Sequence, residues 1–284
     1  MEDIGMLSLI LAIASSAMVS IIMRLSDRKV TGNIAMLTVN YLMCLILSAG
    51  YAGFGSLFPA VEGLPAALLM GCVNGALYLG GFVLLQVNVR RNGVVLSSTF
   101  MKLGLLVSIA VSVLFFHEVP DAVQIIGFCL AVAAIILINF KREIGGTAGF
   151  KAGLILMLLA GGMGDAMAKI FEELGNPALE PQFLTYTFGV ALILCAALML
   201  SKKQRPGKWE ILFGLLIGVP NFFSAKFLLG ALEHIAAVIV YPVYSVATIL
   251  VVSLTGVLVF KERLEKRQWI GMGLILIALV LLNV

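Results

Sequence analysis

Ten long apolar runs constrain this chain more than any other feature of its sequence. They fill most of the 284 residues and are separated only by short polar breaks. A helix that crosses a bilayer needs about 20 consecutive apolar residues, and most of the runs have that length. The pattern predicts a polytopic membrane protein with ten spans, at about residues 4–23, 33–53, 64–88, 93–116, 121–140, 151–171, 182–200, 209–232, 236–260 and 268–284.

The composition excludes most other classes of protein. With 61% hydrophobic and 12% charged residues, a chain of this length could not hide its apolar surface in water. Membrane-spanning strands would be short and alternating in polarity, whereas these runs are long and unbroken, so we expect an all-α fold. The four cysteines lie inside apolar runs without metal-ligand spacing, and we expect no metal site and no disulfide.

The second half of the chain repeats the first. Residues 94–140 align without gaps on residues 238–284, and 14 of the 47 pairs are identical. Polar and glycine pairs are the informative ones, such as Glu118 with Glu262 and Gly127 with Gly271. Each repeat then holds five helices, so the second copy must lie inverted in the membrane. We expect one repeat at 1–144 and an inverted repeat at 145–284, as in many secondary transporters.

Each half ends in an apolar helix, a glutamate-containing hinge and a short glycine-containing helix. The first hinge reads Phe115-Phe116-His117-Glu118-Val119-Pro120 and the second Val259-Phe260-Lys261-Glu262-Arg263-Leu264. With Tyr241-Pro242 opening the ninth run, the chain resembles the ten-helix EamA-type members of the drug/metabolite transporter (DMT) superfamily. The resemblance covers nearly the whole chain and implies a transporter. It leaves the substrate open, because that family moves amino acids, nucleotide-type metabolites, sugars and drugs.

The basic residues indicate an orientation. Sixteen of the 19 lysines and arginines lie in the connections after odd-numbered runs, and the remaining connections and both termini carry only acidic charges. The positive-inside rule places the basic connections in the cytoplasm and both termini outside. The family resemblance implies the opposite orientation, with both termini cytoplasmic. We take the charge bias as the prediction, because every connection is short.

Four charged residues fall within the runs: Lys102, Asp165, Lys169 and Lys226. A charge near the centre of a bilayer costs at least about 2.5–3.5 kcal/mol, so each needs a cavity or a partner. We expect Lys102 and Asp165 to face a substrate cavity, with Asp165 also carrying a coupled proton; the alternative is a structural ion pair between them. Ser98, one turn before Lys102, suggests a polar face. Lys169 has glutamates one turn further on, so it is either a snorkelling residue satisfied by its own helix or a functional group. Lys226 fits a binding role and a snorkelling role equally.

Neutral polar residues add to the predicted substrate site. They recur at helical spacing on the third, eighth and ninth runs, so we expect a central cavity with the fifth and tenth runs at the periphery. The alternative for each is hydrogen-bonded helix packing, which membrane bundles use widely. The candidates are Asn74, Tyr78, Asn221, Tyr241 and Ser245.

The sequence therefore predicts a secondary active transporter that moves a small polar organic metabolite by alternating access. An excess of embedded lysines favours an amino acid-like zwitterion or an organic anion. The alternatives are a non-transporting receptor or scaffold, and an exporter of amphipathic drugs. We expect no enzymatic activity, cofactor or nucleic-acid partner, a monomer or homodimer in the cell membrane of a bacterium, and protons as a candidate coupling ion.

Overall fold

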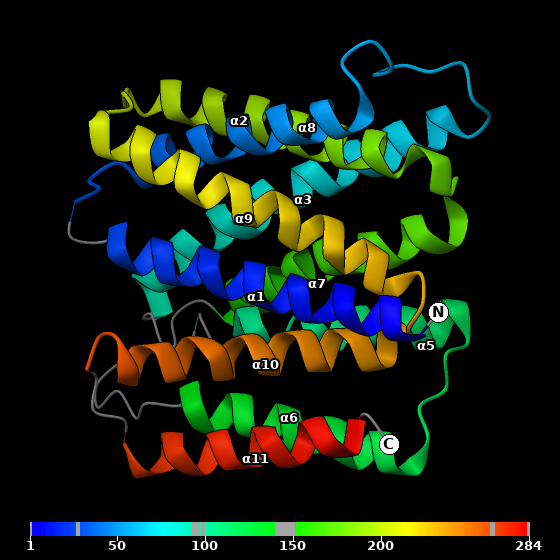
Figure 1. Cartoon of the computed structure of the whole chain (residues 1–284). Helices are drawn as coiled ribbons and strands as arrows, with labels where there is room; N and C mark the ends of the chain where they lie inside the picture. The colour runs from blue at the N-terminus through cyan, green and yellow to red at the C-terminus, as the bar shows by residue number, and fades with distance from the viewer. Residues whose placement is uncertain are drawn as a thin grey trace. The chain divides into compact units, whose positions relative to one another are not determined.

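The computed structural model describes residues 2–26, 29–92, 97, 100–139, 151–261 and 265–282. Each of the ten apolar runs carries one α-helix, so the predicted all-α fold is confirmed. The helices are α1 (Glu2–Ser26), α2 (Asn33–Ala52), α3 (Leu64–Asn92), α5 (Leu105–Phe116), α6 (Ala122–Asn139), α7 (Lys151–Leu174), α8 (Glu180–Ser201), α9 (Lys208–Leu232), α10 (Ala237–Leu258) and α11 (Lys266–Leu282) (Figure 1). Ser98, the hinge residues Glu262–Leu264 and the tail residue Asn283 lie outside the described residues.

Seven of the described helices are long and apolar enough to cross a bilayer. Two further apolar segments are shorter: Phe100–Phe116, which contains α5, and Ala122–Ile138, which lies in α6. The chain forms two compact units that interleave in sequence. Unit 1 comprises Met1–Leu79 and Met167–His234, and unit 2 comprises Gly80–Ala166 and Ile235–Val284. The helices α3 and α7 therefore each contribute to both units.

In unit 1, α2 packs against both α8 and α9, and α1 packs against α9. Glycines permit the closest of these approaches. A Cβ on Gly218 would lie 2.5 Å from Cβ of Met43 and 2.8 Å from the carbonyl oxygen of Asn40, so α2 and α9 meet almost backbone to backbone. Such small-residue contacts hold membrane helices together where the hydrophobic effect between them is weak.

In unit 2, α6 and α11 lie side by side and α10 packs against α5, α6 and α11 (Figure 1). The core of this unit is formed by fully buried aliphatic side chains such as Ile135, Val246 and Ile275. Facing outward, α6 and α11 expose large apolar residues, including Ile126, Ile277 and Val280. Exposed apolar side chains on a spanning helix are favourable toward lipid.

The fourth run differs from the expected continuous helix. Residues 100–102 are helical, Leu103 and Gly104 form a turn, and α5 starts at Leu105. Backbone bonds here span three residues rather than four, from Gly104 N to Met101 O at 3.2 Å and from Val107 N to Gly104 O at 2.8 Å. The turn lies close to α7, because a Cβ on Gly104 would lie 3.1 Å from the nitrogen of Gly162. A short 3₁₀ segment inside a helical run is typical of hinges and functional sites.

Candidate functional site

Lys102 and Asp165 belong to the same unit, and their opposite charges interact electrostatically. Within the described part of the chain, no direct ion pair joins them. Lys102 lies immediately before the turn at Leu103–Gly104, where its side chain is partly exposed. Asp165 lies on α7 and is exposed, although its neighbours Ala166 and Met167 are buried. The structure thus brings the two predicted charges together without joining them.

The helix that carries Asp165 is fixed by its neighbours on both sides. The hydroxyl of Tyr241 on α10 donates a hydrogen bond of 2.9 Å to the backbone oxygen of Asp165. One turn earlier on α7, the backbone oxygen of Gly162 accepts from the Ser108 hydroxyl at 3.0 Å. Tyr241 is 2% exposed, so its hydroxyl positions α7 rather than pointing into open space.

On α10, Ser245 and Thr248 share the face of Tyr241. Ser245 is partly buried, and Thr248 is 3% exposed. The Thr248 hydroxyl has no hydrogen-bond partner among the residues that the structure describes. A buried polar atom of this kind is uncommon in proteins. The polar face of α10 therefore still has hydrogen-bonding capacity.

Asn74 and Tyr78 lie on α3 within unit 1. Asn74 is buried, and its amide nitrogen donates to the Thr187 hydroxyl at 3.5 Å, while its Oδ1 has no partner among the described residues. The ring of Tyr78 packs on Phe188 with 6.3 Å between centroids. Gly75 makes this contact with α8 possible, because a Cβ there would lie 2.9 Å from Cβ of Val190.

Asn221 follows Pro220 in α9 and contacts α2. Its Nδ2 lies 3.2 Å from Oδ1 of Asn40 and 3.6 Å from Sγ of Cys44. Sγ of Cys44 in turn donates to the backbone oxygen of Gly218 at 3.3 Å. These groups satisfy one another where α2 and α9 approach most closely, so the geometry around Asn221 is that of helix packing.

The other two lysines within the apolar runs, Lys169 and Lys226, contact side chains of unit 1. Lys169 is 3% exposed, and its Nζ lies 2.7 Å from Oε2 of Glu172 and 2.6 Å from Oε1 of Glu173. The interpretation that its own helix satisfies Lys169 is confirmed. Lys226 on α9 holds its Nζ 3.7 Å from the ring centroid of Tyr51, and its charge acts on the carboxylate of Glu180.

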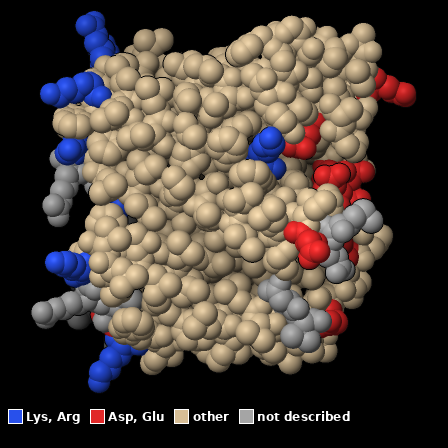
Figure 2. Space-filling model, in the orientation of Figure 1, with Lys and Arg blue, Asp and Glu red and all other residues tan. Residues whose placement is uncertain are grey.

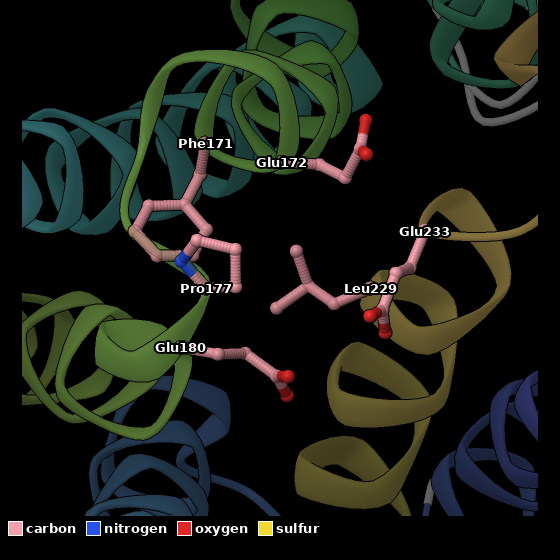
Figure 3. A pocket seen from close by; sticks show the side chains of 6 residues that line it. All are labelled: Phe171, Glu172, Pro177, Glu180, Leu229 and Glu233. Atoms are coloured by element: carbon pink, nitrogen blue, oxygen red, sulfur yellow. The ribbon is translucent and has the colours of Figure 1, made fainter.

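An open pocket in unit 1 was not expected from the sequence. It lies where α7 ends, α8 begins and α9 ends, and Figure 3 shows its lining residues: Phe171, Glu172, Pro177, Glu180, Leu229 and Glu233. The chain turns sharply here because Pro177 opens a 3₁₀ turn whose preceding residue, Asn176, accepts a hydrogen bond from the nitrogen of Ala178 at 3.0 Å. The acidic residues of the pocket, Glu172, Glu180 and Glu233, come from three different helix ends. They show no regular spacing in the sequence that would predict a pocket.

The charged ends of the unit 1 helices differ in sign. On α8, Glu180 lies in the first turn and Lys202 follows the last residue, whereas on α9 Lys208 and Glu210 lie in the first turn and Glu233 follows the last residue. In the upper part of Figure 2, where α2, α8 and α9 lie, basic side chains gather at the left edge and acidic side chains lie toward the right, with one basic side chain beside the acidic ones. Among the described residues no group of three or more His, Cys, Asp or Glu could hold a metal ion.

Known proteins match this chain over its whole length. The model of the EamA-like transporter family matches residues 3–140 and 148–284. A protein of Haemophilus influenzae, described as uncharacterized, is 27% identical over 276 residues, which are 93% of each chain. A crystal structure of another protein matches with a TM-score of 0.78, over 100% of this chain and 98% of that protein's chain. Because the two sequences are only 11% identical, this match supports the fold alone. The chain belongs to the EamA-like transporter family of the drug/metabolite transporter superfamily and is a multi-pass membrane transporter.

Proposed function

We propose that this protein is a secondary active transporter that moves an amino acid-like zwitterion by alternating access, with Lys102 and Asp165 as its charged binding groups. Lys102 would receive the solute carboxylate and Asp165 its ammonium group. The proposal includes the division into two inverted repeats at 1–144 and 145–284. It rests on the internal repeat, and the two stretches matched by the family model agree with it.

One observation carries the proposal: Asp165 is exposed in the middle of an apolar membrane helix. A carboxylate that faces lipid would cost at least about 2.5–3.5 kcal/mol, so an exposed one belongs in a water-filled space. Lys102 is also partly exposed, and its charge interacts with that of Asp165. The 3₁₀ turn beside Lys102 supports this, because interrupted helices line the solute sites of many transporters.

The partners of the other embedded charges narrow the solute class. Counting lysines in the sequence favours an anion or a zwitterion, but Glu172 and Glu173 neutralise Lys169, and Lys226 acts on Glu180. Lys102 and Asp165 then offer one charge of each sign. A site of zero net charge with separated poles matches a zwitterion and disfavours a simple organic anion.

The remaining candidates take supporting roles in this proposal. Tyr241 positions the backbone of Asp165, and Asn221 holds α9 on α2. Ser245 shares the face of Tyr241 on α10. In the other unit, Asn74 retains a side-chain oxygen without a hydrogen-bond partner among the described residues, and Tyr78 lies one turn from it on α3. Asp165 would also carry a coupled proton, since a carboxylate that meets both water and solute can exchange one.

Ligand-induced stabilisation tests the solute class. Neutral amino acids should raise the melting temperature of the purified protein, because a ligand that binds only the folded state stabilises it. The matched amines and the matched carboxylic acids, each lacking one charge, should give no comparable rise. A rise with amphipathic cationic drugs alone would favour the drug-exporter alternative, and no rise with any small solute would favour a receptor or scaffold.

We further propose that both termini face outward. The basic helix ends, represented by Lys202 and Lys266, would then face the cytoplasm, as the positive-inside rule requires. Single cysteines can be placed at these two positions in a protein whose own cysteines do not react. In intact cells an impermeant thiol reagent should not label them. A cysteine at Glu62 should react quickly. Labelling at 202 and 266 with protection at 62 would establish the inverse orientation.

A further inference from the structure

The pocket of unit 1 combines carboxylates with an apolar wall. Its volume is about 50 Å³, and the pocket is open to solvent. Three of its lining residues are glutamates, and the other three are Phe171, Pro177 and Leu229. The side chain of Phe171 is held in place, because its ring stacks on that of Phe183 with centroids 4.3 Å apart. A cavity built in this way suits a ligand with one charged end and one apolar end.

The three carboxylates are not equivalent. Glu172 is held by Lys169 at 2.7 Å, whereas Glu180 and Glu233 act on each other as like charges. In Figure 3 the side chains of Glu180 and Glu233 extend from α8 and from the end of α9 into the space beside Leu229. Two like charges that face one space are stabilised by a cation between them.

The protein itself shows which cation this region accepts. The ammonium of Lys226 lies 3.7 Å from the ring centroid of Tyr51, and its charge acts on Glu180. A cation over an aromatic face and near a carboxylate is the usual arrangement for binding organic ammonium groups. Because Glu180 both lines the pocket and responds to Lys226, a ligand ammonium and the Lys226 ammonium would compete for it.

The lining favours an organic cation over a metal ion. Calcium takes six to eight oxygen ligands in proteins, whereas half of the residues around this pocket have side chains of carbon and hydrogen alone. An alkyl or aryl group of a few carbon atoms could instead lie against Phe171, Pro177 and Leu229 and lose its contact with water.

We propose that this pocket binds a small organic ammonium ion, with the charge between Glu180 and Glu233 and the carbon chain against Phe171, Pro177 and Leu229. Lys226 acts as a built-in competitor that lowers the affinity. This site is separate from Lys102 and Asp165, and it requires no particular transported solute. Its test and the test of the proposed function can therefore fail independently.

The test measures binding of n-butylammonium to the purified full-length protein by calorimetry, with n-butanol as the uncharged control. Lys226→Met should tighten binding about fivefold, because the competing ammonium is gone while the bulk of the side chain remains. Glu180→Gln should weaken binding at least about tenfold. Glu233→Gln should also weaken it, and this side chain is 62% exposed, so the exchange leaves the fold intact. Glu180→Asp should restore part of the affinity.

Glu62→Gln is the matched control, since Glu62 is an exposed acid outside the pocket and its exchange should leave the affinity unchanged. Equal binding of n-butylammonium and n-butanol would overturn the proposal. So would an unchanged affinity in both glutamine variants of the pocket, or weaker binding in Lys226→Met.

Discussion

Exchange of Asp165 for asparagine is expected to reduce solute flux at least about tenfold while the protein remains folded and membrane-inserted. Asp165 is exposed and forms no direct ion pair within the described chain, so its exchange breaks no ion pair. Neutralising it should cost little stability and remove the group that holds the solute ammonium. Lys102→Met should have the same effect through the solute carboxylate.

The comparison of both single variants with the double variant separates a binding site from a structural pair. Breaking a buried pair leaves an uncompensated charge and typically costs about 3–5 kcal/mol. If Lys102 and Asp165 formed such a pair, both single variants would melt far lower and the double variant would recover stability. We expect instead that all three variants melt near the wild-type temperature and that all three transport at least about tenfold more slowly than wild type.

The same variants test proton coupling. If Asp165 carries the coupled proton, residual flux through Asp165→Asn should no longer depend on pH, whereas Lys102→Met should keep a pH dependence. Solute counterflow in proteoliposomes over a range of external pH measures this. A pH profile that is unchanged in Asp165→Asn would assign proton transfer to another group.

Removal of both acidic partners of Lys169 is the second change with a large expected effect. In Glu172→Gln/Glu173→Gln the Lys169 ammonium, 3% exposed, loses the carboxylates at 2.7 and 2.6 Å. The two carboxylates are partly open to water, with 23% and 37% of their side chains exposed, so we expect the lower end of the range for buried pairs, about 3 kcal/mol.

Thermal melting in detergent measures this loss. Each single glutamine variant should melt much closer to wild type, because one carboxylate remains. Addition of Lys169→Met to the double variant should recover most of the stability, since no buried charge is left. A double variant as stable as wild type would show that Lys169 depends on neither glutamate.

The sequence was sufficient for the fold because each helix is specified locally. Long apolar runs determine the spans, and the residues after them end the helices, as Pro177 does before α8. The local exception is the turn at Leu103–Gly104. It lies where Gly104 approaches Gly162. These two residues are far apart in the sequence, and no local pattern of residues indicates that contact.

The sequence could predict only the charged residues of the candidate site. Lys102 and Asp165 are recognisable because a charge in an apolar run needs an explanation. Neutral residues such as Asn221 carry no such information, since an amide that binds solute and an amide that packs against Asn40 look alike in sequence. The pocket at Glu180 and Glu233 escaped prediction because it depends on how three helix ends meet.

Flux of matched solutes into proteoliposomes tests the central claim most directly. The panel contains labelled neutral amino acids, each with the amine that lacks its carboxylate and the acid that lacks its ammonium group. We expect at least one amino acid to be transported, with its amine and its acid carried about tenfold more slowly or less, because each lacks one ionic contact. Equal rates for an amino acid and its acid, or no flux above empty vesicles, would contradict a zwitterion transporter built on Lys102 and Asp165.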